Sequence, residues 1–340
     1  MKILFVGSLP PPIGGTTISF KMLTDIVFGK KLRCEPVLLN LSSYKTREIR
    51  SLLYMIFDLI KEIYKSDVVT LHLTIYSFRH FGLFAALVSK LLGKKIVIRR
   101  FGGGVVGDFT GISRFLLICL YKLADAGFMQ TKRQLSEAES LGLKSQWLPT
   151  SRIPPTVVKQ SNIAEKFIFV GHVKEDKGIV ELINVFTEFS KKYKDCTLDI
   201  YGPDFIDVNR LIDCPNISFK GVIPNSNIYQ TLENYDVMVF PTFYSGEGYP
   251  GVLIEGLHSG LPIITTRWKS IPELIDSSTG ILVDIHQEKQ LYKALENIHL
   301  NSDLYKRLST QCLQESQKFD ANLLAESFLD FLYELNTGKD

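Results

Sequence analysis

The segment Val237 to Thr265 reads VMVFPTFYSGEGYPGVLIEGLHSGLPIIT, and the interpretation of the whole chain starts from it. It opens with a short apolar run, passes through a glycine-rich turn and then shows a helical pattern from Pro250. Proline suits the first position of a helix, because the N–H that it lacks would have no partner there. Gly260 and Pro262 mark the end of the helix, and a second apolar run follows. The segment therefore predicts a strand, a loop, a helix and another strand of a parallel sheet.

Two glutamates flank the predicted start of this helix. A loop that leads into a helix presents free backbone N–H groups, which suit an anion such as a phosphate. Glu247 precedes the helix and Glu255 lies in its second turn, so both carboxylates can reach groups of a ligand beside that anion. The alternative is two solvated charges near a helix end. A spacing of eight residues alone does not decide between them.

The residues around these glutamates resemble the donor-site signature of glycosyltransferase family 4. That signature has a strand ending in proline, two glutamates separated by seven residues, and then a glycine, a proline and a strand. The matching residues here are Pro241, Glu247, Gly248, Tyr249, Pro250, Glu255, Gly260 and Pro262. The resemblance implies that Glu255 binds the nucleotide ribose and Glu247 the transferred sugar, with Gly248, Tyr249, Pro250 and Gly251 completing this part of the donor site.

Length and composition fit two ordinary domains. The chain has 340 residues, 45% of them hydrophobic, and its five cysteines have no spacing typical of a zinc or redox motif. The start of the chain, MKILFVG, is typical of a strand rather than a signal peptide. No uncharged apolar run reaches the eighteen or more residues of a membrane-spanning helix. We therefore expect a protein of the reducing cytoplasm.

The charge is distributed unevenly along the chain. Residues 1–158 carry 22 Lys and Arg against 10 Asp and Glu, a net charge of +12, and the remainder carries −9. This asymmetry indicates that the first half meets an anionic surface. No nucleic-acid motif is present, so we expect an anionic membrane as partner, a peripheral position on its inner face, and no nucleic acid. The basic, partly apolar helices predicted at 49–64 and 78–92 fit this, although ordinary sheet-facing helices have similar patterns.

The order of apolar runs and helical patterns predicts the fold class. Strand-like runs in the first half are 2–6, 35–39, 67–72, 95–100 and 126–130, and helical patterns lie between them. A proline-rich, polar stretch at 147–162 is typical of a linker. A second series of strand-like runs follows at 167–170, 197–201, 217–220, 237–240, 263–265 and 281–283. Such alternation predicts an α/β protein with two doubly wound parallel sheets.

The first strand leads into a glycine pair, Gly14 and Gly15, at the start of a helix. A dinucleotide-binding motif would need G-x-G-x-x-G here and an acid at the end of the second strand, and neither is present. A dehydrogenase is therefore disfavoured. The pair instead resembles the family's glycine loop, which approaches the donor diphosphate. A plain turn remains the alternative.

Three further features of the first half carry acceptor-side predictions. His72 ends the third strand, where a histidine lines a ligand cleft less often than it belongs to the rim or core. Arg100 ends the fourth strand and is followed by Phe101, Gly102 and Gly103. Many family members have a histidine where this chain has Phe101, so the resemblance leaves Arg100, Gly102, Gly103 and His72 as acceptor-side candidates and puts a histidine-assisted mechanism in doubt.

The second series begins with another family feature. The family has an arginine and later a lysine-glycine pair that neutralise the donor diphosphate. Lys177 and Gly178 match the pair, but His172 stands at the arginine position and brings less charge. A solvated lysine at a helix start is the alternative for Lys177. Gly202 and Val222 lie in segments that follow the family's layout around the nucleobase.

The resemblance implies the glycosyltransferase B (GT-B) architecture: two Rossmann-like domains facing across a cleft. We place the acceptor domain at 1–158, the donor domain at 159–318, and a helix that crosses back to the first domain at 319–340. The implied reaction is retaining transfer from a nucleotide diphosphate sugar to a saccharide or lipid-linked saccharide acceptor, in the synthesis of cell-envelope polysaccharide or lipopolysaccharide.

No Asp-x-Asp motif is present, so we expect no metal and no other cofactor. The catalytic candidates are Glu247, Lys177 and His172, with charge on the leaving diphosphate stabilised by Lys177, His172 and helix-terminal N–H groups. A nucleotide-sugar epimerase of the same architecture and a non-catalytic nucleotide-sugar-binding subunit remain alternatives.

Overall fold

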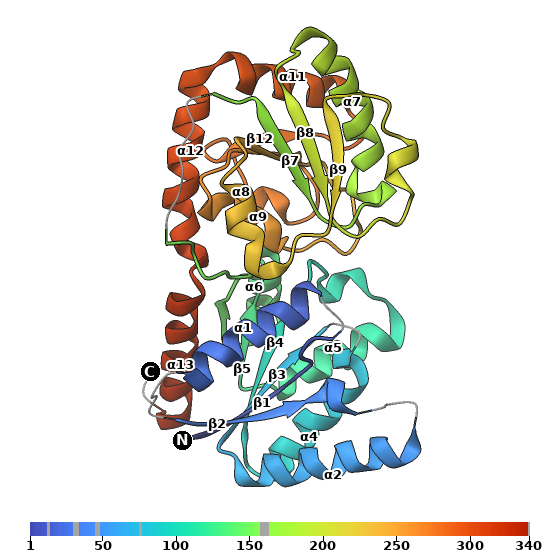
Figure 1. Cartoon of the computed structure of the whole chain (residues 1–340). Helices are drawn as coiled ribbons and strands as arrows, with labels where there is room; N and C mark the ends of the chain where they lie inside the picture. The colour runs from blue at the N-terminus through green and yellow to red at the C-terminus, as the bar shows by residue number, and fades with distance from the viewer. Residues whose placement is uncertain (12–13, 30–33, 45–47, 75–76, 157–162, 339–340) are drawn as a thin grey trace. The chain divides into compact units, whose positions relative to one another are not determined.

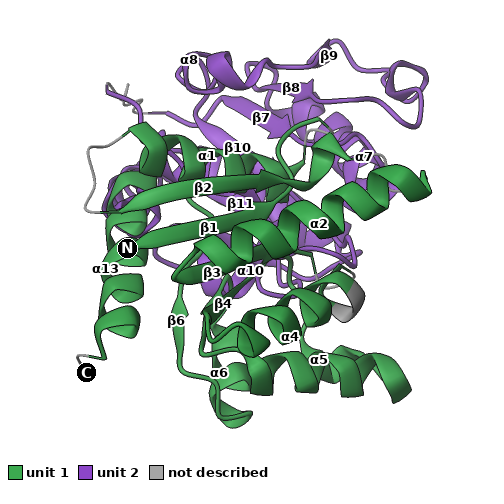
Figure 2. Cartoon of the chain, turned by 90° about the horizontal axis from the view of Figure 1, so that it is seen from below, with its two compact units in different colours: residues 1–151, 321–340 green, residues 152–320 purple. Residues whose placement is uncertain are grey.

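The computed structural model describes residues 1–11, 14–29, 34–44, 48–74, 77–156 and 163–338. Its chain divides into two compact units, which Figure 2 shows in different colours. Unit 1 comprises Met1–Ser151 and Ala321–Asp340, and unit 2 comprises Arg152–Asp320. The boundary predicted after residue 158 lies outside the described residues.

Unit 1 is built on a six-stranded sheet in which every described pair of neighbours is parallel. The strand order is β2-β1-β3-β4-β5-β6. The strands are β1 (Lys2–Gly7), β2 (Glu35–Asn40), β3 (Val68–Leu73), β4 (Lys95–Arg100), β5 (Ala126–Met129) and β6 (Ser145–Trp147). The first five match the predicted runs within two residues, and β6 was missed because its three residues carry no apolar pattern.

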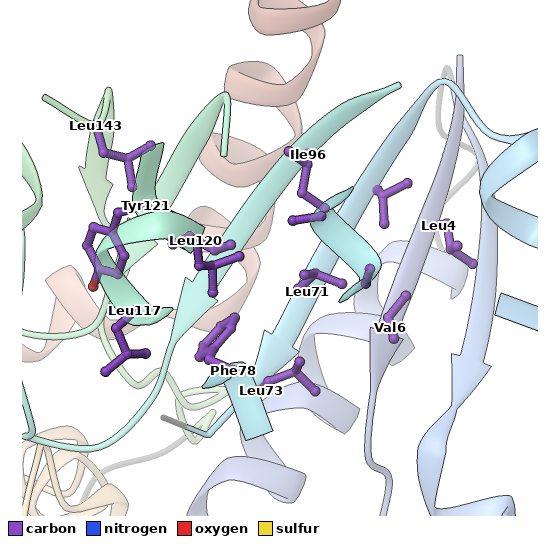
Figure 3. Packing of buried hydrophobic residues seen from close by; sticks show 14 of the residues in the cluster. Leu4, Val6, Leu71, Leu73, Phe78, Ile96, Leu117, Leu120, Tyr121 and Leu143 are labelled. Carbon is purple, nitrogen blue, oxygen red and sulfur yellow. The ribbon is translucent and has the colours of Figure 1, made fainter. Parts of the chain in front are cut away.

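Helices cover both faces of this sheet (Figure 1). The helices of unit 1 are α1 (Gly15–Gly29), α2 (Ile49–Lys65), α4 (Leu83–Leu91), α5 (Gly111–Leu123), α6 (Lys132–Ser140) and α13 (Ala321–Thr337). Side chains of α2, α4, α5 and α6 pack on one face, where Figure 3 shows Leu71, Phe78 and Leu120 among the buried residues. Side chains of α1 and α13 pack on the other face. The segment predicted to return to the first domain contains α13, which lies beside α1.

Unit 2 has a second six-stranded sheet, again with parallel neighbours and in the order β12-β11-β10-β7-β8-β9. Its strands are β7 (Lys166–Val170), β8 (Thr197–Tyr201), β9 (Ile217–Gly221), β10 (Val237–Phe240), β11 (Ile263–Thr266) and β12 (Gly280–Val283). Its helices are α7 (Ile179–Lys192), α8 (Ile228–Leu232), α9 (Gly251–His258), α10 (Ile271–Leu274), α11 (Glu288–Leu300) and α12 (Ser302–Ser316). The two sheets confirm the predicted α/β class.

The central segment folds nearly as its sequence predicts. β10 is buried along its whole length, as a strand covered by helices on both faces should be. Pro250 is the N-cap residue of α9 rather than its first helical residue, because its ψ of 124° is extended. Gly256 lies where a Cβ would come 3.1 Å from two atoms of Met238, so this glycine lets α9 lie close to the sheet.

The chain order of unit 2 reverses between β7 and β10, which are neighbours in the sheet although they are far apart in sequence. Crossovers leave these two strands in opposite directions, so the carboxyl edge between them stays open for a ligand. In unit 1 the corresponding reversal lies between β1 and β3. None of the described helices is long and apolar enough to cross a membrane.

Gly202 makes the closest backbone approach at the carboxyl edge of unit 2. Its φ is 142°, and a Cβ there would lie 1.7 Å from the carbonyl oxygen of Gly171. The clash is with backbone, which cannot move as a side chain can. Glycine at this position is therefore required by packing, independently of any role in binding a nucleobase.

We expect Gly202→Ala to lower the free energy of unfolding by about 2–4 kcal/mol, because it adds a backbone clash to an unfavourable φ. The matched control is Gly221→Ala, whose φ of 78° is also positive but whose Cβ would meet nothing within 4 Å. This control should cost only about 1–2 kcal/mol. Urea unfolding of both variants provides the comparison, and equal losses would contradict the steric argument.

Candidate functional site

Lys177 and Glu247 form a buried ion pair at the open edge of unit 2. Lys177 follows β7 at the end of a short 3-10 turn, and Glu247 lies in the loop between β10 and α9. The Nζ of Lys177 lies 2.5 Å from Oε2 of Glu247, and the two side chains are 12% and 9% exposed. Thr242 donates a 2.8 Å hydrogen bond from Oγ1 to the same oxygen. The fold therefore brings together two of the three predicted catalytic residues.

Aromatic rings complete the surroundings of Lys177. Its Nζ lies 4.5 Å from the ring centre of Tyr244 and 5.4 Å from that of Phe240. The negative face of an aromatic ring attracts an ammonium group. The lysine is thus held by a carboxylate and two rings while the protein has no ligand.

Glu255 is paired as well, with a residue that the sequence analysis did not identify. The Nε of Arg152 donates to Oε1 of Glu255 at 2.5 Å, and both side chains are largely buried. The guanidinium lies against the first residue of α9, since a Cβ on Gly251 would come 1.6 Å from Nη2 of Arg152. Glu255, the residue predicted to bind the ribose, is therefore paired with a permanently charged arginine, and the missing side chain of Gly251 makes room for that arginine.

His172 is exposed in the loop that follows β7. Its ring centre lies 5.4 Å from that of Phe205. Partial loss of solvent around the ring, together with the charges of Lys174 and Lys177, lowers the pKa of His172 below its ordinary value. In the protein without ligand this histidine is therefore neutral at pH 7, unlike the arginine that the family pattern leads one to expect.

The remaining predicted donor residues differ in exposure. Gly248, Tyr249 and Pro250 are buried, and the Tyr249 hydroxyl donates to Oε2 of Glu273 at 2.8 Å. Val222 follows β9 and is 64% exposed. The aromatic residue thus fixes the loop before α9, whereas Val222 offers an apolar surface at the edge of the sheet.

The glycine pair of unit 1 has no packing reason for being glycine. Gly14 accepts the hydrogen bond from the N–H of Ile18 that opens α1, and it exchanges hydrogen bonds with the Thr17 hydroxyl. A Cβ on Gly15 would meet nothing within 4 Å, and one on Gly14 would meet Thr17 Oγ1 at 3.9 Å. The space beside this helix start is therefore free for a ligand.

The acceptor-side candidates separate into two faces of the unit 1 sheet. Arg100 is fully buried and donates to the Tyr121 hydroxyl at 2.5 Å and to the Gly104 carbonyl at 2.8 Å. This arginine holds the loop containing Gly102 and Gly103 from the core side. His72 is also buried, between the rings of Phe5 and Phe20.

Sequence reasoning missed Arg152 and also Arg99, which precedes Arg100 and faces the opposite side of the sheet. Arg152 lies 103 residues from its partner, and no local pattern signals such a pair. Arg99 was overlooked because Arg100, at the end of the strand, was the candidate. Strand alternation places the two side chains on opposite faces of the sheet. Among the described residues, no group of three or more His, Cys, Asp and Glu side chains is arranged to hold a metal ion.

We expect Lys177→Met to lower the free energy of unfolding by about 3–5 kcal/mol, because it leaves the buried carboxylate of Glu247 without its cation. Adding Glu247→Gln removes that charge, so the double variant should be more stable than Lys177→Met alone. A double-mutant cycle by urea unfolding measures this coupling. The exposed pair Lys191 and Glu188, changed in the same way, should show coupling below about 1 kcal/mol. Additive losses at Lys177 and Glu247 would contradict the pairing.

Known proteins can now be compared with this geometry. Residues 164–301 match the family model described as glycosyl transferases group 1, and this range contains both ion-paired glutamates. An uncharacterized 41.2 kDa protein in the cps region of Klebsiella pneumoniae is 27% identical over 52% of this chain and 49% of its own length. An uncharacterized glycosyltransferase of Haemophilus influenzae is 22% identical over 81% of this chain and 78% of its own.

A third relative carries a more specific name. The capsular polysaccharide biosynthesis glycosyltransferase CapM of Staphylococcus aureus is 29% identical over 38% of this chain and 35% of its own length. This chain therefore spans half or less of two of these three curated relatives.

Solved structures extend the likeness to nearly the whole chain. Anabaena HepE in complex with UDP is similar with a TM-score of 0.79 and 14% identity, covering 98% of this chain and 100% of that one. At this identity the likeness establishes the fold. The chain has the GT-B fold of two Rossmann-like units, and its residues 164–301 match the model of the group 1 glycosyl transferases.

Proposed function

We propose that the protein is a retaining glycosyltransferase, which moves a sugar from a nucleotide diphosphate sugar to a saccharide or lipid-linked saccharide in cell-envelope polysaccharide synthesis. The buried Lys177–Glu247 pair, at the strand reversal and beside the start of α9, carries this proposal. The group 1 match over 164–301 supports transferase chemistry. The names of CapM and of the structural relative with bound UDP support the polysaccharide and the nucleotide-sugar donor.

The chemistry requires positive charge where the diphosphate departs. Lys177 supplies a full charge, and the free N–H groups at the start of α9 supply partial charge. His172 is neutral without ligand, but a bound diphosphate opposes the effect of Lys174 and Lys177 and favours its protonated form. The contact of Gly14 and Gly15 with the diphosphate stays a prediction from the family resemblance. We propose that these groups act without a metal.

Glu247 then has two tasks in the proposed reaction. Its Oε2 accepts from Lys177 and Thr242, so one oxygen of the carboxylate is fixed by the protein. The other oxygen can accept a hydrogen bond from a hydroxyl of the transferred sugar. One carboxylate then holds both the sugar and Lys177. The departing diphosphate can take the proton of the attacking hydroxyl on the face that it leaves, so the anomeric configuration is retained.

Glu255 binds the ribose in the same proposal. Arg152 donates to Oε1 of this largely buried carboxylate, while Oε2 is left for the ribose hydroxyls. A charged acceptor makes stronger hydrogen bonds than a neutral one. Arg152 thus positions Glu255 without occupying the oxygen that is proposed to bind the ribose.

Glu255→Ala tests the donor site. Losing hydrogen bonds to a charged acceptor should weaken binding of UDP and of the sugar donor alike by about 1.5–3 kcal/mol, or roughly ten- to a hundredfold. Calorimetric titration measures this, and Glu188→Ala on the exposed face of α7 is the control. An unchanged affinity for UDP would rule out the ribose role.

An assay on the unmodified protein tests the reaction. Transfer should require an acceptor, with the product keeping the donor's anomeric configuration. UDP released from UDP-sugar without any acceptor would instead indicate the epimerase, and binding without turnover across donors and acceptors would indicate the non-catalytic subunit.

We also propose that unit 1 docks on an anionic membrane. Helix α2 has a buried stripe at Met55, Leu59 and Ile63 and a second apolar stripe that is exposed. The exposed stripe consists of Ile49, Leu53, Phe57, Ile60 and Tyr64, at 40–78% exposure. Residues three or four apart line one side of a helix, so these five form a continuous strip.

Neighbouring helices extend this exposed surface, here called the apolar strip. On α4, which contacts α2, Phe84, Leu87 and Leu91 are exposed at the same spacing. Exposed basic residues accompany the strip at Arg50, Lys61, Lys65, Lys90 and Lys95. Apolar side chains with a basic rim are typical of helices that lie in the interface of an anionic bilayer.

Leu53→Ser with Phe57→Ser should reduce binding to anionic vesicles at every salt concentration, because it removes apolar area from the strip. Raising the salt concentration should weaken vesicle binding by the unmodified protein only in part, because salt screens the charges of the basic rim and leaves the apolar contacts. Leu300→Ser, at an exposed apolar position of unit 2, is the control. Sedimentation with vesicles measures all three proteins. Wild-type binding by the double variant would contradict docking through the apolar strip.

A further inference from the structure

Arg99 is a buried cation without a hydrogen bond or ion pair among the described residues. It lies next to the end of β4 and is 3% exposed. Its Nε and Nη1 are fully buried and make no hydrogen bond. A buried charge of this kind is costly unless an opposite charge accompanies it.

The neighbouring Arg100 shows what a structural arginine looks like in this protein. Its Nη1 and Nη2 both donate, one to Tyr121 and one to Gly104, and its Nε alone is buried without a partner. Arg99 instead has its guanidinium carbon 4.7 Å from the ring centre of Phe101. The ring supports the flat group from one side and leaves its N–H groups unused. Burial lowers the pKa of Arg99 to about 9, so the group stays charged at pH 7.

His72 stands beside Arg99, since the two residues are register partners on adjacent parallel strands. Neighbouring strands are about 4.8 Å apart. Burial and the charge of Arg99 lower the pKa of His72 well below its ordinary value, so its ring is neutral. The ring is also held by Phe5, Phe20 and Phe328, which fix its orientation.

The hydrogen bonds around His72 determine which ring nitrogen carries its proton. The Thr70 hydroxyl donates to the Leu4 carbonyl, so it has a lone pair but no proton for His72. The contact of 3.1 Å between His72 Nε2 and Thr70 Oγ1 therefore requires the proton on Nε2. Nδ1 is left as a buried acceptor with no partner among the described residues.

Two more unpartnered polar atoms lie on elements around this pair. Ser19 Oγ is buried on α1, which covers this face of the sheet. Gln130 Oε1 is buried directly after β5, the strand next to β4. Unpartnered donors on Arg99 and an unpartnered acceptor on its register partner His72 thus lie on adjacent strands near the carboxyl edge of a parallel sheet, where such folds bind ligands.

We propose that Arg99 and His72 form a binding site for an oxyanion that has a hydroxyl group beside it. Arg99 supplies the charge and the N–H donors, and His72 Nδ1 accepts from the hydroxyl. A uronic acid carries this combination, and so does singly protonated inorganic phosphate. If the ligand belongs to the reaction, the acceptor is an acidic saccharide. That identification rests on the proposed function, whereas anion binding itself does not.

The test measures binding to the full chain in the absence of a donor, so it does not depend on transfer. Glucuronate, inorganic phosphate, glucose and chloride at matched ionic strength are titrated, and thermal stabilisation is followed. We expect stabilisation by glucuronate that exceeds the effects of glucose and chloride. Arg99→Met should weaken this apparent affinity about ten- to a hundredfold. Arg133→Met, which changes an exposed arginine of the same unit, should leave it unchanged.

Two further readouts separate binding from a purely structural role. Without ligand, Arg99→Met should raise the unfolding temperature, because it replaces an unpaired buried charge with an apolar side chain of similar length. Arg99→Lys keeps the charge and should retain more of the anion response than Arg99→Met, which gives a second test if the methionine variant does not fold.

The outcomes are distinguishable. A response to phosphate alone, lost in Arg99→Met, supports the anion site and assigns it to free phosphate rather than to a sugar acid. Equal responses of the unmodified protein and both Arg99 variants, or stabilisation no greater than that by chloride, would overturn the proposal.

Discussion

The reversal of strand order between β7 and β10 is the constraint on which the candidate donor site depends. A parallel sheet needs a crossover after each strand, and at a reversal the two crossovers leave in opposite directions. The loop after β7 brings Lys177, and the loop after β10 brings Glu247. Their pairing places a positive and a negative charge at this open edge. The same topology explains why residues 70 positions apart lie in direct contact.

The sequence predicted the fold class and ten or more strand positions because buried parallel strands are continuous apolar runs, which a single sequence displays directly. A turn, a proline and a helix pattern also indicated Glu247 before the helix and Glu255 in its second turn, whereas Lys177 was indicated by the resemblance to the family pattern. The sequence could not reveal Arg152. That residue lies in a proline-rich stretch, and its contact with Glu255 depends on how a segment 103 residues earlier in the chain folds back onto α9. Nor could it show that Arg99 and Arg100 differ in their hydrogen bonds. Strand alternation places the two side chains on opposite faces, but it does not say which face offers hydrogen-bond acceptors.

Both departures from the family pattern have a local physical setting. Phe101 stands where relatives have a histidine, and its ring lies over the guanidinium of Arg99, so an aromatic support replaces a group that could carry a proton. His172 stands where relatives have an arginine. Two lysines lie close enough to lower its pKa, so a second permanent charge there would add to repulsion that Lys174 and Lys177 already create. The loop after β7 therefore carries its positive charges on Lys174 and Lys177, while its histidine is neutral at pH 7.

The two units treat buried charge in opposite ways. In unit 2, Lys177 and Arg152 each have a carboxylate partner, so a donor must compete for groups that are already satisfied. A ligand gains there mainly by adding contacts to the free oxygens of Glu247 and Glu255. In unit 1, Arg99 has no acid beside it among the described residues, and an arriving anion would remove a desolvation cost that the protein already bears. Equal hydrogen bonds should therefore contribute more binding free energy at Arg99 than at Lys177. Unit 2 can keep its site ordered without a ligand, whereas the stability of unit 1 should respond to the ionic composition of its surroundings.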